Sequence, residues 1–189
     1  MKKISVDKIF QRGIDLMKEK KFEEAKNEFE RINQRDNEKY YLQAQLCLID
    51  IYIRSGQWIE VIKTSEGILE NHCSGMLKKE TVKIQLRLGY SYLLIKRWKD
   101  AVKIFNLIDE RDCESYDEVR IGLAGAHIEL NQEKEAVELF LRVLDGTQHR
   151  FDIARNRLGT LCLQKGLGMQ AIKALESVSN KDYMLYYDS

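Results

Sequence analysis

A unit of about 35 residues recurs along this chain, and this recurrence constrains the fold more than any other feature. Its clearest copy covers residues 82–109, where apolar residues follow the three-and-four spacing of amphipathic helices in two successive segments. A short turn at 95–97 separates the segments, and Trp98 opens the second. Gly89 lies inside the first, where glycine costs about 1 kcal/mol relative to alanine, so two closely packed backbones are expected there. The unit is therefore predicted to be a hairpin of two helices.

Five copies of this unit lie in phase. A small or β-branched residue recurs where the two helices are expected to cross, at intervals of 36, 40, 35 and 35 residues, as Ala25, Val61, Ala101, Ala136 and Ala171. A large apolar residue follows four positions later in four copies, as Phe29, Phe105, Phe140 and Leu175, with Ser65 as the exception. The first helices carry a small residue in four copies, as Gly13, Gly89, Ala124 and Gly159, with Ile49 as the exception. The pattern predicts a continuous array of hairpins.

This pattern resembles the tetratricopeptide repeat family, whose unit is a helix–turn–helix of about 34 residues. The resemblance covers roughly residues 5–180 and implies an all-α, right-handed α-solenoid that forms a single domain over 1–189. The expected repeats are approximately 6–37, 42–74, 82–114, 117–149 and 152–180, followed by a helical stub at 181–189. The chain differs from the family in having no proline, so its helices are expected to end on glycine and polar caps, with Gly56 as a left-handed terminator.

In this family the first helix of each hairpin lines a concave groove that receives a peptide or a helix of a partner. The resemblance therefore implies a non-catalytic protein–protein interaction scaffold. The register assigns to the groove Phe10, Ile14, Asp50, Lys83, Arg87, Tyr90, Ile121, Gly122, Gly125, Asn156 and Arg157. The same register adds the neighbouring positions Met17, Leu46, Ile53, Leu86, Ile128, Ile153 and Thr160. Apolar positions would supply affinity, and the cations would pair with carboxylates of the partner.

Two features of this predicted groove have alternative interpretations. Lys83 and Arg87 either bind a partner or simply belong to a solvated helix face. Gly122 and Gly125 lie three residues apart on neighbouring parts of one helix face. They either leave a hollow in the groove or allow close packing against an adjacent helix.

No motif of a known catalytic site occurs in the chain. The sequence lacks GxxxxGK, GxGxxG and GxSxG, so neither a phosphate-binding loop nor a nucleophile elbow is expected. The histidines are isolated, and His127 takes the register position of Tyr52 and Tyr92, which indicates a packing role. The four cysteines form no CxxC pair, so neither a metal site nor a cofactor is predicted. The chain is not expected to be an enzyme.

Charge and hydropathy limit the partners and the location. The net charge is +1, from 31 basic and 30 acidic residues, which makes nucleic acid an unlikely partner. No apolar run approaches the length of about 18 residues that indicates a membrane span, and the N-terminus lacks the apolar core of a signal peptide. A cytoplasmic protein without membrane contact is therefore expected. The apolar and aromatic stub at 181–189 either caps the end of the array itself, or the chain is cut from a longer protein, or this end self-associates; truncation or self-association is favoured.

Two further functions are compatible with the pattern. The 35-residue spacing is shared with helical-repeat proteins that bind single-stranded RNA and read bases through polar groove residues, although the apolar residues here argue against this function. The chain would equally suit a ligand-sensing or peptide-sensing regulatory domain of a longer protein. The sequence does not separate this last function from that of a scaffold.

Overall fold

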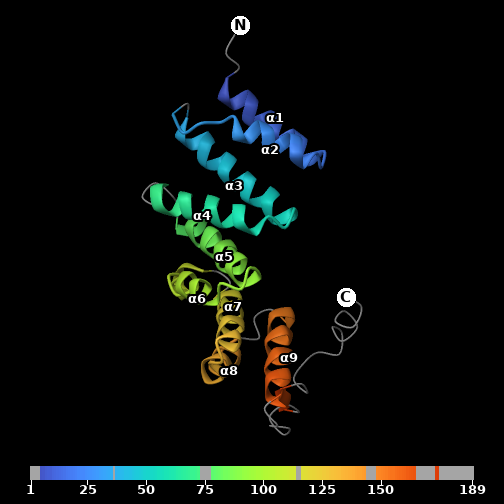
Figure 1. Cartoon of the computed structure of the whole chain (residues 1–189), viewed down its shortest axis with the longest axis vertical. Helices are drawn as coiled ribbons and strands as arrows, with labels where there is room; N and C mark the ends of the chain where they lie inside the picture. The colour runs from blue at the N-terminus through green and yellow to red at the C-terminus, as the bar shows by residue number, and fades with distance from the viewer. Residues whose placement is uncertain are drawn as a thin grey trace. The chain divides into compact units, whose positions relative to one another are not determined.

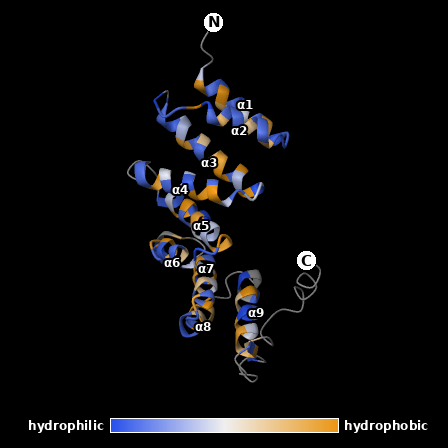
Figure 2. Ribbon diagram, in the orientation of Figure 1, coloured by the Kyte–Doolittle hydropathy of each residue, from blue (hydrophilic) through white to orange (hydrophobic). Residues whose placement is uncertain are grey.

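The computed structural model describes residues 5–35, 37–72, 78–113, 116–143, 148–164 and 173–174. Within these ranges the chain forms helices and no β-strand, which confirms the predicted all-α class (Figure 1). The helices are α1 (Val6–Lys18), α2 (Phe22–Glu30), α3 (Glu38–Arg54), α4 (Trp58–His72), α5 (Lys78–Leu94), α6 (Trp98–Phe105), α7 (Tyr116–Glu129), α8 (Glu133–Leu141) and α9 (Gln148–Gln164), with a 3-10 turn at Glu110–Asp112. Figure 2 shows hydrophobic and hydrophilic residues alternating along the helices, as amphipathic helices require.

The chain divides into two compact units, Met1–Ile95 and Lys96–Ser189. In the first unit, α1 packs against α2, α2 against α3, α3 against α4 and α4 against α5, and α1 also meets α3. In the second unit, α6 to α9 pack in the same sequential way, and α7 also meets α9. The second helix expected in the fifth repeat lies outside the described residues except for 173–174, as does the stub at 181–189.

The turns between paired helices repeat with the same intervals as the crossing residues. Their left-handed residues are Lys20, Gly56, Lys96 and Asn131, with φ of 61°, 68°, 62° and 56°. Each lies five positions before a crossing residue, and the predicted left-handed role of Gly56 is confirmed. In three of these turns, the backbone N–H of the residue after the left-handed one donates to a carbonyl of the preceding helix. The pairs are Lys21 to Leu16, Gln57 to Tyr52 and Gln132 to His127, at 2.8 to 2.9 Å. These helices therefore end without proline, through Schellman-type bonds.

Helix pairs meet through one small and one large side chain. The ring of Phe29 lies so close to Gly13 that a Cβ atom there would come within 2.6 Å of its Cε1 atom, which explains the glycine in α1. At the corresponding positions of α3 and α4 the sizes are reversed, because Ile49 and Ser65 stand there and both are fully buried. In the second hairpin the large residue therefore stands on the first helix and the small one on the second.

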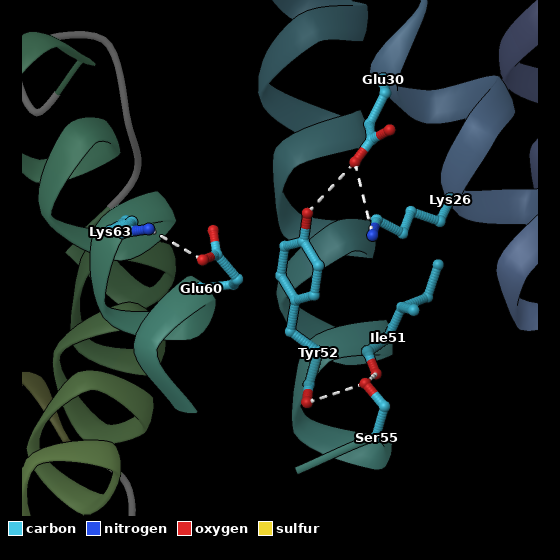
Figure 3. Close-up of polar contacts among 7 residues, drawn as sticks. All are labelled: Lys26, Glu30, Ile51, Tyr52, Ser55, Glu60 and Lys63. Carbon is cyan, nitrogen blue, oxygen red and sulfur yellow. Dashed lines mark hydrogen bonds and ion pairs between the residues drawn. The ribbon is translucent and has the colours of Figure 1, made fainter. Parts of the chain in front are cut away.

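Successive hairpins of the first unit are joined by a repeated hydrogen bond. The Tyr52 hydroxyl of α3 donates to Glu30 Oε1 of α2 at 3.3 Å, and Lys26 Nζ lies 3.8 Å from the same oxygen (Figure 3). Tyr92 of α5 donates in the same way to Glu66 of α4. The shared geometry shows that the repeat register extends to polar contacts within this unit.

In the second unit this tyrosine position is occupied by His127. Its Nδ1 atom lies 2.8 Å from Gln132 Oε1, a residue of the turn that follows its own helix. Asn106 stands where the earlier hairpins carry the glutamate. His127 therefore forms a local polar contact at the end of α7.

Candidate functional site

Predicted groove residues of α1 contribute to the core of the first unit. The ring centroid of Phe10 lies 5.7 Å from that of Phe29 and 5.4 Å from that of Tyr40. Ile14 is half-buried and packs against the same apolar cluster. These contacts give both side chains a role in packing neighbouring helices, and both side chains are half-buried.

The predicted groove of α3 and α5 contains an ion pair. Arg87 Nη2 lies 2.6 Å from Asp50 Oδ1, and both side chains are about one-third to two-fifths exposed. Burial raises the pKa of the nearby Cys47 thiol to about 11, and the Asp50 carboxylate adds to this effect. The thiol therefore stays protonated at neutral pH. The Arg87 guanidinium therefore already has a carboxylate partner within the first unit.

The other two predicted residues of α5 differ in exposure. Lys83 is exposed, whereas Tyr90 is half-buried. Exposure of Lys83 agrees with either interpretation of this residue, a binding position or a solvated face.

Ile121 and Gly122 of α7 are buried in the second unit. A Cβ atom at position 122 would lie 2.6 Å from Cζ of Phe105 in α6, so the glycine permits close helix packing. Ile121 belongs to the apolar cluster around Phe140. Both residues are therefore inaccessible to a partner, and of the two alternatives for Gly122 the structure supports close packing.

Gly125, three residues further along α7, lies at a hollow. A cavity of about 440 Å³ opens between α7 and α9. Its lining comprises Gly125, Ile128, Glu129, Ile153, Asn156, Arg157, Thr160, Leu161 and Gln164. Six of these nine residues were assigned to the groove by the sequence register. Glu129, Leu161 and Gln164 were missed, although each follows a predicted residue of its own helix at a spacing of four.

The hollow combines an apolar lining with polar groups. Ile128, Ile153 and Leu161 supply the apolar surface, whereas Arg157 on α9 is exposed. Within the described part of the chain, the guanidinium of Arg157 makes no ion pair and the side-chain amide of Asn156 makes no hydrogen bond. These two groups are therefore available for a ligand, in contrast to the paired Arg87.

A second hollow lies in the first unit, beside α3 and α4. It has a volume of about 310 Å³ and is lined by Gln34, Tyr41, Gln45, Lys63, Thr64, Gly67, Ile68 and Asn71. Its polar groups are partly satisfied within the chain: Lys63 pairs with Glu60 at 2.8 Å (Figure 3), and the Asn71 amide donates to the Gly67 carbonyl at 2.9 Å. None of the predicted groove residues contributes to this hollow.

The described residues meet the requirements of neither a metal site nor a membrane span. They include no group of three or more histidine, cysteine or acidic side chains arranged to hold a metal ion. None of the described helices has both the length and the apolar character needed to cross a bilayer.

No family model, curated protein or solved structure matches the chain. The resemblance to the tetratricopeptide repeat family therefore rests on the recurring residues of the chain itself.

Proposed function

We propose that this chain is a non-catalytic protein–protein interaction scaffold of the tetratricopeptide type, an α-solenoid that holds a peptide segment of a partner along its first helices. The observation that supports this function best is the hollow between α7 and α9. Six of its lining residues are positions that the repeat register assigns to the peptide groove. The proposal includes a cytoplasmic location, which suits the free thiols of Cys47, Cys113 and Cys162.

The size and chemistry of the hollow suit a peptide side chain and its flanking backbone. A volume of about 440 Å³ lies within the range of about 300 to 1,000 Å³ that ligand sites commonly have. Ile128, Ile153 and Leu161 offer apolar surface to a side chain. The carboxamides of Asn156 and Gln164 offer both donors and acceptors, which the backbone N–H and C=O groups of an extended peptide require.

Filling the hollow tests this function. A Cβ atom at Gly125 would meet only Arg157 Nη1, at 3.5 Å, an ordinary contact distance. Gly125→Leu is therefore expected to fold, since a helix interior also favours leucine over glycine. Peptides selected from a displayed random library on the unaltered chain should lose at least about tenfold in affinity for this variant, because the larger side chain occupies their site.

Gly67→Leu is the matched control. It places the same side chain at a helix glycine beside the second hollow, where an added Cβ atom would meet nothing within 4 Å. The selected peptides should bind this variant as they bind the unaltered chain. Peptides that bind Gly125→Leu with undiminished affinity would reject the hollow between α7 and α9 as the peptide site.

A further inference from the structure

Two residues beside the hollow occupy the same repeat positions as the two residues of an ion pair in the first unit. Arg87 lies two residues before the small first-helix position of its repeat, and Asp50 lies one residue after that position in the repeat before. In the fourth and fifth repeats the same two positions are Gly125 and Arg157. Arg157 thus corresponds to Arg87, and Gly125 corresponds to Asp50.

The geometry agrees with this correspondence. In the first unit, Arg87 Nη2 contacts Asp50 Oδ1 at 2.6 Å. In the second unit, Arg157 Nη1 lies 3.5 Å from the place that a Cβ atom would take at Gly125. The guanidinium of α9 therefore approaches the site where an aspartate would stand, but glycine has no carboxylate to offer.

No other described residue replaces the missing carboxylate. Glu129 also lines the hollow, yet Arg157 makes no ion pair with it or with any residue in the described ranges. An arginine beside an apolar surface gains most from a charged acceptor, because the fork of its guanidinium matches the two oxygens of a carboxylate.

We infer that the hollow between α7 and α9 binds an acidic segment of a partner protein, whose aspartate or glutamate side chain pairs with Arg157 in place of the carboxylate missing at Gly125. This inference rests on the proposed scaffold function and specifies its ligand. The apolar lining from Ile128, Ile153 and Leu161 adds a second requirement. The acidic residue of the partner should have an aliphatic neighbour.

Restoring the carboxylate within the chain tests the inference. The variants are Gly125→Asp and, as a control of nearly equal shape without charge, Gly125→Asn. The probe is a displayed library of random peptides fused at both ends, so that every carboxylate comes from an aspartate or glutamate side chain. Peptides selected on the unaltered chain should be rich in acidic residues beside aliphatic ones. They should bind Gly125→Asp at least about tenfold more weakly than Gly125→Asn, because the new carboxylate occupies Arg157.

A peptide-free measurement checks the geometry. Asp and Asn at position 125 are compared in the unaltered chain and in Arg157→Gln, which removes the charge. The Tm of the Asp variant minus the Tm of the Asn variant should be about 1 to 2 °C higher with Arg157 than with Gln at position 157. This cycle cancels the effect of a negative charge near the C-terminal end of α7. Equal differences in both backgrounds would show that Arg157 does not reach position 125, and would overturn the inference.

The outcomes separate this inference from the proposed function. Peptides that lose affinity for Gly125→Leu, yet lack acidic residues and bind Gly125→Asp and Gly125→Asn equally, would overturn the acidic ligand and leave the scaffold standing. A second library with free carboxyl termini tests the source of the carboxylate. Binding by that library alone would overturn the assignment to a side chain. Absence of any peptide sensitive to Gly125→Leu would reject both proposals.

Discussion

Ser65 is a fully buried polar residue in the second hairpin, and its hydroxyl has no hydrogen-bond partner among the described residues. A buried hydroxyl without a partner costs about 1 to 3 kcal/mol in stability. Ser65→Ala is therefore expected to raise the free energy of unfolding by about 1 kcal/mol, with some help from the higher helix propensity of alanine. Urea denaturation followed by circular dichroism measures this change.

Ser91→Ala provides the matched comparison. Ser91 is also buried in a helix of the first unit, but its hydroxyl donates to the Arg87 carbonyl at 2.8 Å. Loss of this bond offsets the gain in helix propensity, so no increase in stability is expected. Equal stabilisation by both substitutions would show that helix propensity alone explains the effect at position 65.

The Tyr52 hydroxyl links stability to alkaline pH. Burial raises its pKa from 10.0 to about 12, and the neighbouring Glu30 carboxylate adds to the increase. Because the folded state holds this proton more tightly than the unfolded state, its contribution to stability is complete below pH 10. The contribution is lost as the pH rises from 10 to about 12.

Tyr52→Phe removes this titration. The variant is expected to be less stable by about 1 kcal/mol at neutral pH, because the hydrogen bond to Glu30 is lost. Its stability should fall less between pH 10 and about 12 than that of the unaltered chain, as measured by urea denaturation across this range. Parallel pH profiles for the two proteins would argue against a raised pKa at Tyr52.

At the level of the helices, the left-handed turns are sites where single substitutions have opposite effects. Lys96 adopts a φ of 62°, which costs a residue with a Cβ atom about 1 kcal/mol or more, whereas Gly56 adopts 68° at no such cost. Lys96→Gly is expected to raise Tm by about 2 °C, and Gly56→Ala to lower it by about 2 to 4 °C. Differential scanning calorimetry gives both values. A loss of stability in Lys96→Gly would mean that the lysine side chain makes contacts worth more than the backbone strain.

The reversed pair in the second hairpin predicts a compensating double substitution. Ser65→Phe alone should overpack the interface of α3 and α4, and Ile49→Gly alone should leave a cavity, each costing about 3 kcal/mol. The double variant restores the arrangement seen at Gly13 and Phe29, and should recover at least half of the summed loss. Strictly additive losses in urea denaturation would show that the two positions do not share one space.

The sequence predicts the helices better than it predicts the groove. Recurring small and large residues locate the helix pairs because helix packing requires them at fixed spacing. Of the left-handed turn residues, Gly56 was expected because glycine favours that conformation, whereas Lys20, Lys96 and Asn131 follow only from their position five residues before a crossing residue. Lysine carries no such preference, and asparagine carries a weaker one than glycine.

The groove depends on neighbours that a register does not specify. Gly122 and Gly125 lie on one helix and share a residue type, but the ring of Phe105 fills the space beside the first and no ring fills the space beside the second. Similarly, Arg87 and Arg157 share a register position, and only Arg87 has an aspartate opposite. Exposure and pairing follow from side chains on other helices, which a repeat pattern does not place in space.

Across the whole molecule, the balance of charge bears on the RNA-binding alternative. The net charge of +1 provides no excess of cations for a phosphate backbone. We therefore expect no gel shift with single-stranded RNA at about 50 mM salt, where non-specific electrostatic binding would be strong. A shift at low salt that disappears as salt is added would contradict this expectation and favour an RNA-binding protein over a peptide-binding scaffold.

Each of the two compact units has an apolar cluster of its own. The first unit is built around residues such as Phe29, Ile49 and Ile84, and the second around residues such as Phe140 and Leu158. Of the proposed binding features, the hollow with an unpaired arginine lies in the second unit, whereas the corresponding arginine of the first unit is paired. The repeats therefore share a packing plan while differing in the surface they present.

Ile49 and Ser65 also bear on the history of the chain. If the second hairpin descends from a copy with the Gly13 and Phe29 arrangement, either first mutation would have produced two bulky or two undersized neighbours. Both intermediates would be less stable than the starting pair and the final pair, so selection would oppose either single change. Descendants of this hairpin should keep the two residues or replace both together, which makes the pair a durable marker of this repeat among related chains.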